Sequence, residues 1–187
     1  MALSTNSTIG RDLRALRKSK GVTLQALSAG VGRSVGWLSQ VERDITEPDI
    51  GDVEALTKAL GVPLSLVAGG AAGPENETGR IVRAHARRAI GPDIGGLCET
   101  LASPDLTDPF EVVHSVFQPG ATRTEPVRRA TTELAFMVSG SLQVTIAGEA
   151  FTVNAGDSFR LRGEAFTWTN VTSKPAVALW VIAPPVY

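Results

Sequence analysis

Residues 23–69 read TLQALSAGVGRSVGWLSQVERDITEPDIGDVEALTKALGVPLSLVAG, and this stretch decides the fold of the first third of the chain. Its apolar residues recur at intervals of three and four, which is the spacing of one helix face. Thr23 and Ser34 each stand directly before such an apolar stripe, where an N-cap residue is preferred, and Pro48 and Asp49 begin another. The pattern predicts several short helices joined by connections of a few residues.

Two more helices flank this stretch. Ile9, Leu13 and Leu16 form an apolar stripe that precedes Gly21, a residue suited to ending a helix. At the other end, Pro63 suits the first turn of a helix over residues 64–68. The prediction is therefore an all-α domain of five helices over residues 1–70.

The second half of the chain follows a period of two. Leu142, Val144 and Ile146 alternate with polar residues, and the same alternation recurs around residues 151–154 and 177–181. Turn-forming pairs containing glycine or proline separate these runs at intervals of eight to twelve residues, which is typical of a β-sandwich or barrel. We expect an all-β domain over residues 80–187. The segment 71–79 is small, polar and poor in apolar residues, and it is expected to be a linker.

The composition restricts the functions that the chain can have. The net charge of the 187 residues is −1, so affinity for nucleic acid must come from local charge. A single cysteine, Cys98, cannot form an internal disulfide, which is typical of a protein of the reducing cytoplasm. The sequence has no run of eighteen apolar residues, so neither a transmembrane helix nor a membrane partner is expected.

Charge is segregated within the helical half. Residues 1–43 contain seven Lys or Arg and two acidic residues, whereas residues 44–72 contain one Lys and five acidic residues. A basic face opposite an acidic one is suited to docking on a phosphate backbone. A solvated amphipathic surface has the same pattern, so charge alone leaves both interpretations open.

The order of residues in this half resembles the Xre/Cro-type helix-turn-helix family over residues 7 to 70. The positions that match include Leu27, Gly32, Ser34, Leu38, the run 39–43 (SQVER), Pro48, Leu56 and the run 59–62 (ALGV). Ser28 and Asp44 depart from the family, which has alanine and glycine there. The resemblance implies that the helix from Ser34 to Arg43 enters the major groove of double-stranded DNA.

The resemblance also implies which residues contact DNA. Val35, Gly36 and Gln40 stand where the family reads bases, and Gln40 can pair bidentately with adenine. Phosphate contacts are expected from Arg11, Arg14, Gln25, Arg33, Ser34, Trp37 and Arg43. Glu42 is expected to pair with a nearby arginine instead of contacting DNA.

The β half resembles the cupin family of double-stranded β-helix barrels. Gly120, Glu133 and Gly140 occur at the spacings of the first cupin motif, but its two histidine positions are Pro126 and Arg128. The third histidine position falls on or near Phe166. Since none of these three side chains can ligate a metal, we expect no metal and no cofactor. An unusual site that uses His114 is the alternative.

The position of Arg128 matters because the family's histidine points into the barrel. A buried guanidinium needs a counter-charge. This would be Glu133 as an internal ion pair, or the carboxylate or phosphate of a small effector, and the two roles are compatible. Phe166, Trp168, Met137 and Phe136 could line a pocket, or they could be ordinary core. Arg123, Arg129, Arg160 and Arg162 are expected at the solvated surface.

Together these features predict a sequence-specific transcriptional regulator. Its cupin domain would sense a small molecule, with an anion as one possible anchor group, and would support a homodimer that binds a palindromic operator. The first alternative is a cupin metalloenzyme of the epoxidase type, which the missing histidines oppose. The second is an antitoxin-like module that binds a partner protein.

Overall fold

The computed structural model describes residues 9–68, 74–93 and 95–186 and divides the chain into two compact units. The helical unit comprises residues up to 91 together with 104–108, and the β unit comprises residues 92–103 and 109–186. Residues 1–8 of the predicted helical domain and residues 71–73 of the predicted linker lie outside the described residues. The boundaries predicted at residues 70 and 80 therefore remain a proposal.

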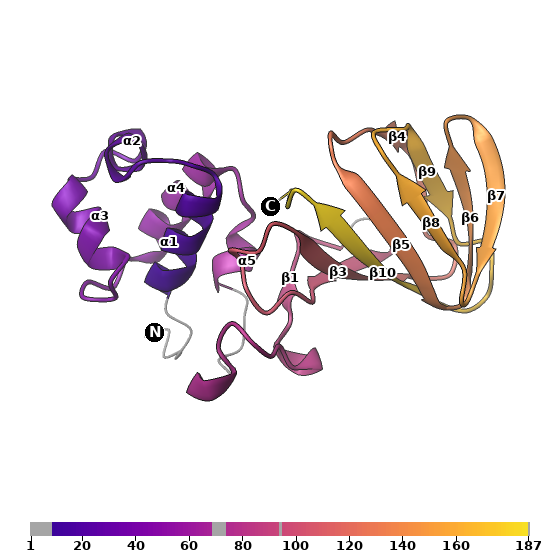
Figure 1. Cartoon of the computed structure of the whole chain (residues 1–187), viewed down its shortest axis with the longest axis horizontal. Coiled ribbons are helices and arrows are strands. Elements are labelled where there is room, and N and C mark those ends of the chain that lie inside the picture. Colours follow the sequence, from indigo (N-terminus) through magenta and orange to yellow (C-terminus); the bar gives the residue numbers. More distant parts are fainter. Residues whose placement is uncertain (1–8, 69–73, 94, 187) are drawn as a thin grey trace. The chain divides into compact units, whose positions relative to one another are not determined.

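Five α-helices form the first part of the helical unit (Figure 1). They are α1 (Ile9–Ser19), α2 (Leu24–Gly30), α3 (Val35–Val41), α4 (Ile50–Leu60) and α5 (Leu64–Ala68). The predicted N-caps Thr23 and Ser34 are confirmed, and Asp49, which was predicted to begin the fourth helix, caps it. Each of the three accepts a hydrogen bond from the backbone N–H three residues later. Gly21 and Gly61 adopt the left-handed conformation that ends α1 and α4.

The core of the helical unit comes from the predicted stripes. Leu13 and Leu16 of α1 are fully buried, as are Leu38 and Val41 of α3 and Val53 and Leu56 of α4. Ile45, four residues after Val41, is 63% exposed. The reason is that α3 ends at Val41, so Ile45 no longer follows its periodicity.

The chain that follows the helices stays with the helical unit. It contains the 3₁₀ turns η1 (Glu75–Glu77) and η2 (Ala84–Ala86) and the short strand β1 (Arg88–Ala89). Arg88 forms an ion pair with Asp12 of α1 at 2.8 Å and donates to the carbonyl of Leu66 at 2.8 Å. The hydroxyl of Ser65 donates to the carbonyl of Ala89. These contacts attach residues 88–89 to α1 and α5, beyond the predicted start of the β domain.

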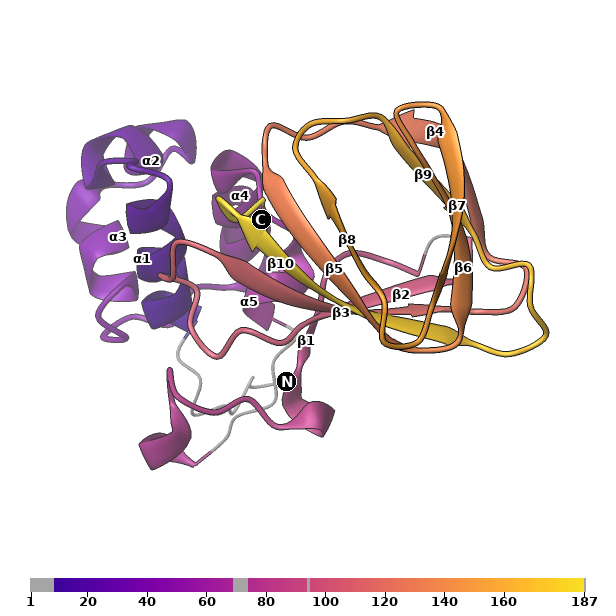
Figure 2. The same cartoon turned by 45° about the vertical axis from the view of Figure 1, so that its right-hand side comes forward.

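The β unit consists of two antiparallel sheets (Figure 2). One contains, in spatial order, β2 (Leu97–Leu101), β3 (Glu111–Phe117), β10 (Ala176–Ala183), β5 (Thr132–Ser139) and β8 (Ser158–Leu161). The other contains β4 (Thr122–Val127), β9 (Phe166–Thr169), β6 (Ser141–Ile146) and β7 (Glu149–Asn154). Gly140, with φ of 75°, makes the turn between β5 and β6, and an added Cβ there would lie 2.7 Å from Ala176.

Strand alternation separates the inner and outer faces of the first sheet. On β3, burial alternates strictly, with Glu111, Val113, Ser115 and Phe117 buried. On β5 and β10 the alternation buries Ala135, Met137, Ala178, Trp180 and Ile182 among others. These inner side chains face the core between the sheets, where Phe117 packs edge-to-face on Trp168 at 4.7 Å between ring centroids. The prediction of an all-β barrel-like domain is confirmed.

The outer positions of β10 are Val177, Leu179 and Val181. In the pairing with β5, Leu179 stands opposite Phe136 and Val181 opposite Leu134. Both faces of β10 are therefore apolar.

No helix in the described part of the chain is long and apolar enough to cross a membrane.

Candidate functional site

The predicted recognition helix is presented to solvent at its N-terminal end. The hydroxyl of Ser34 accepts from the N–H of Trp37 at 3.1 Å, which caps α3. Val35 and Gly36 on the first turn are exposed, while Leu38 and Val41 anchor the opposite side in the core. This arrangement leaves the first turn of the predicted recognition helix exposed to solvent.

Arg33 has partners within the unit. Its guanidinium forms an ion pair with Asp52 of α4 at 2.7 Å and lies 5.0 Å from the ring centroid of Trp37. The cation–π contact and the ion pair hold Arg33 and Trp37 against the start of α4. The acidic residue thus orients a side chain that was predicted to contact phosphate.

Gln40 lies exposed on the last turn of α3. Its amide oxygen accepts from the hydroxyl of Thr46 at 3.1 Å, and its backbone carbonyl accepts from the N–H groups of Ile45 and Thr46. Residue Thr46, which the sequence analysis did not single out, therefore positions the predicted base reader. Arg43 is exposed, and its Nε donates to the carbonyl of Ser39 at 3.0 Å.

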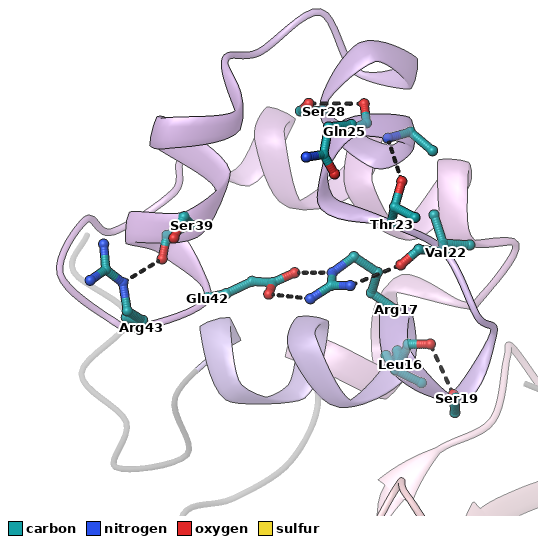
Figure 3. A network of polar contacts seen from close by, with 11 residues as sticks. Leu16, Arg17, Ser19, Val22, Thr23, Gln25, Ser28, Ser39, Glu42 and Arg43 are labelled. Atoms are coloured by element: carbon teal, nitrogen blue, oxygen red, sulfur yellow. Dashed lines mark hydrogen bonds and ion pairs between the residues drawn. The ribbon is translucent and has the colours of Figure 1, made fainter.

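A buried ion pair connects the first and third helices (Figure 3). The guanidinium of Arg17 in α1 donates to both carboxylate oxygens of Glu42, at 2.6 and 2.8 Å, and to the carbonyl of Val22 at 2.8 Å. The hydrogen bond to Glu42 raises the pKa of Arg17 above its usual value. The prediction that Glu42 pairs with a nearby arginine is confirmed.

The remaining predicted phosphate contacts are exposed basic or polar side chains. Arg11 and Arg14 lie on the outer side of α1, and Gln25 lies on the first turn of α2. All ten predicted contact residues thus belong to α1, to α2, or to α3 and its flanking residues. Nine of them are exposed and Trp37 is half-buried.

Four of the five predicted ligand-binding residues lie in the core between the two sheets of the β unit. Glu133 and Met137 occupy inner positions of β5, and Phe166 and Trp168 occupy buried positions of β9. Phe166 also belongs to an aromatic cluster with Phe159 and Trp180. Phe136, by contrast, is 47% exposed, so it does not line the interior.

Arg128 does not point into the barrel, and that expectation is corrected. Val127 pairs with the buried Phe166 across β4 and β9, so strand alternation turns the next residue outward. Arg128 is exposed, and its nearest polar partner is the carbonyl of Gly163 at 3.5 Å. The register of β4 against β9 shifts between Arg123 and Val127, but both of these residues pair with buried aromatic residues of β9.

The partner of Glu133 is the neighbouring arginine. Arg129, predicted to lie at the solvated surface, lies 3.7 Å from the carboxylate of Glu133 while remaining 39% exposed. The hydroxyl of Thr131 donates to the same carboxylate at 2.7 Å. Glu133 is therefore satisfied from the segment directly before its own strand.

Two further inner residues were missed by the sequence analysis. Glu111 is almost completely buried, and burial is the main cause that raises the pKa of its carboxyl group. The N–H of Val186 donates to it at 3.1 Å. Trp180 is buried, and its indole Nε1 has no hydrogen-bond partner among the residues that the structure describes. The alternation of buried residues along 111–117 could have indicated that Glu111 is buried. Valine occurs at both the odd and the even positions of this strand, however, so the sequence does not show which set faces the core.

The donor set does not fit a cupin metal centre. Proline, arginine and phenylalanine stand at the family's histidine positions and offer no side-chain ligand. Within residues 9–68, 74–93 and 95–186, no three His, Cys, Asp or Glu side chains are grouped closely enough to hold a metal ion. No step of the protein's action is therefore assigned to a metal.

Two domain families match the chain. The helix-turn-helix domain family matches residues 8–68, and the cupin domain family matches residues 113–182. The β unit also resembles the structure of KdgF from Halomonas sp., with a TM-score of 0.50 and 18% identity over 58% of this chain and 96% of that one. This likeness supports the barrel fold.

Curated relatives are similar to part of this chain. The transcriptional regulator ClgR of Mycobacterium tuberculosis is 34% identical over 105 residues, which are 56% of this chain and 94% of the relative. The immunity repressor protein of Bacillus phage phi105 is 32% identical over 62 residues, which are 33% of this chain and 43% of that protein. With five short helices followed by a two-sheet β unit, the chain belongs to the Xre-type helix-turn-helix family of DNA-binding transcriptional regulators and has a cupin domain after the helices.

Proposed function

We propose that this regulator binds a specific palindromic operator as a homodimer and that its cupin domain senses a small molecule without catalysing a reaction. The observation that carries DNA recognition is the free N-terminal face of α3. Ser34 caps that helix, Val35 and Gly36 are exposed on its first turn, and Gln40 is held on its last turn. Direct base readout is expected chiefly from Gln40, with shape readout contributing at other positions.

The sensing role is supported by the interior of the β unit. Arg123 stands opposite Trp168 in the pairing of β4 and β9, so its side chain leaves the strand on the inner face. It is half-buried, and none of the hydrogen bonds or ion pairs found among the described residues involves its guanidinium. Arg123 therefore takes over the anion-anchoring role first proposed for Arg128, with Trp168, Phe166 and Met137 as the apolar wall.

Glu133 has a different role in this proposal. Arg129 and Thr131 already satisfy the carboxylate of Glu133. Glu133 therefore stabilises the start of β5 and does not bind the effector. The absence of imidazoles at the motif positions argues against the metalloenzyme alternative.

Action on operator DNA would place the protein in the cytoplasm.

The test of DNA recognition uses the intact chain and duplexes selected from a random pool. Fluorescence anisotropy should show preference for the selected duplex over a scrambled one. Affinity should fall steeply as salt rises, since basic side chains displace counterions from phosphates. Equal affinity for both duplexes at every salt concentration would overturn the proposal.

Native mass spectrometry of freshly purified protein tests the sensor and its alternatives. A retained small molecule that is lost in Arg123→Ala but kept in Arg128→Ala supports the proposed anchor. Stoichiometric iron, zinc or manganese would favour the enzyme, and a second co-purified polypeptide would favour the antitoxin-like module.

A further inference from the structure

The outer face of the first β sheet is apolar across its three central strands. Its outward positions carry Val112, His114 and Val116 on β3, Val177, Leu179 and Val181 on β10, and Leu134, Phe136 and Val138 on β5. Leu134, Phe136, Val138 and Val181 are each 42–48% exposed. We define these nine residues as the outer apolar face.

The sequence of β10 indicates that both faces of this strand are covered in the working protein. Residues 176–183 read AVALWVIA, an unbroken apolar run in the centre of the sheet. Such runs are typical of strands buried on both sides, whereas a strand with one solvated face alternates with polar residues. The inner side of β10 packs in the core, but the β unit has no helix in its described residues that could cover the other side.

The charges around this face identify the kind of occupant. On the three central strands, His114 is the single ionisable residue at these outward positions, and Arg160 lies on the edge strand β8, opposite Leu134. Nucleic acid would require a row of cations, which these strands lack. In a two-fold symmetric dimer, the same patch of each copy contacts its counterpart on the other copy. An uncharged apolar centre therefore avoids repulsion between identical charged groups.

The size of the face fits a stable dimer. Strands β3, β10 and β5 at about 4.8 Å spacing span roughly 14 Å, and the eight residues of β10 extend about 26 Å, so the flat area of the outer apolar face is about 370 Å². This area suits the apolar core of a standard interface of ~800 Å² per partner, with the flanking strands β2 and β8 in its rim.

We infer that a second copy of this chain packs on the outer apolar face, sheet against sheet, and that this contact forms the homodimer. The inference rests on the dimerisation proposed above and names its surface. Leu179 and Phe136, which stand side by side on neighbouring strands, lie near its centre. Paired chains would supply the two recognition helices that a palindrome requires.

Charged substitutions at equally exposed apolar residues provide the test. Phe136→Glu and Val181→Lys place charges on the outer apolar face. Phe151→Glu, at a residue of β7 that is also 47% exposed, and Val171→Lys, at a residue that is 60% exposed outside both sheets, are the matched controls. Circular dichroism and thermal unfolding establish that each variant is folded.

Analytical ultracentrifugation of the intact chain measures the result. Wild type and controls should sediment at twice the chain mass of 19.6 kDa. The two face variants should show a dimer dissociation constant raised at least tenfold. A monomeric wild type at tens of micromolar, or folded face variants that dimerise like the controls, would overturn the inference.

DNA binding separates this inference from the proposed function. The face variants should lose affinity for a two-half-site duplex while keeping wild-type affinity for a single half-site. If wild type binds the palindrome and the face variants match it in both mass and affinity, the surface is wrong and the regulator proposal stands. If wild type dimerises through this face but prefers no duplex, the operator proposal fails and the surface stands.

Discussion

The guanidinium of Arg17 and the carboxylate of Glu42 form a two-point hydrogen-bonded ion pair, with Nε and Nη2 donating at 2.6 and 2.8 Å (Figure 3). Both side chains are at least nine-tenths buried. The pair ties α1 to the residue that ends α3, and so it sets the position of the recognition helix.

Glu42→Ala should destabilise the helical unit by about 3–5 kcal/mol, because it leaves the Arg17 guanidinium buried without a counter-charge. Chemical denaturation of the intact chain, followed by circular dichroism, measures the loss. Arg33→Ala removes an exposed pair with Asp52 and a cation–π contact with Trp37, and should cost only about 1–2 kcal/mol. Equal losses for the two variants would show that the buried pair contributes no more than the exposed one.

Ser34→Ala should lower the free energy of unfolding by about 1 kcal/mol, because the N–H of Trp37 loses its cap. DNA affinity should fall as well, since the first turn of α3 carries Val35 and Gly36. Ser34→Asn retains an acceptor at the N-cap and should restore stability. If the Asn variant is as unstable as the Ala variant, the hydroxyl has a role other than capping.

Gln40→Ala should reduce discrimination at one base pair of the selected duplex by about 1–3 kcal/mol, because a bidentate contact is removed. Anisotropy titrations against single-base-pair variants of that duplex measure it. Arg14→Ala is the control, as loss of a phosphate contact weakens binding to all sequences alike and lowers the salt dependence. An unchanged preference in Gln40→Ala would show that another residue reads that position.

Glu111→Gln should raise the melting temperature of the β unit by a few degrees at pH 7–8, and the gain should vanish near pH 4. Burial raises the pKa of Glu111 above its usual 4.5, with Glu133 and Glu99 adding to the effect and Val186 and Arg129 opposing it. The folded protein thus binds this proton more tightly than the unfolded chain does. The stability it contributes is complete below about pH 4.5 and is lost as pH rises through the raised value.

Calorimetry between pH 4 and 8 follows the change. Glutamine keeps an acceptor for the N–H of Val186 without the charge. Glu125→Gln, at an exposed residue of β4, should leave the profile unchanged. A gain in Glu111→Gln that is constant with pH would contradict the assigned cause.

Much of the fold could be predicted because the signals are local. The caps at Thr23 and Ser34 act on backbone groups three residues away, and the sequence predicts both positions correctly. The third helix ends earlier than the helix expected from Ser34 to Arg43, because the end of a helix depends on one or two residues. Here the chain leaves the helix after Val41, four residues before Ile45.

The candidate site could be predicted only in part, since a residue's side of a sheet depends on partner strands. A motif spacing placed Arg128 inside the barrel, but Arg128 is exposed directly after the end of β4. Arg123 lies on the inner side because it pairs with the buried Trp168, and the ion pair with Glu133 goes to Arg129.

The amino-acid sequence alone determined which segments become helices and strands, the family of each half, and the lack of imidazoles at the cupin motif. These features follow from periodicity, capping and residue chemistry, which operate over a few neighbouring residues. Only the tertiary structure decided that Val177, Leu179 and Val181 face outward and that Trp180 faces the core. The outward and inward side chains of β10 are both apolar, so hydrophobicity does not decide which of them face the core. Pairing with β3 and β5, strands far away in the sequence, decides it.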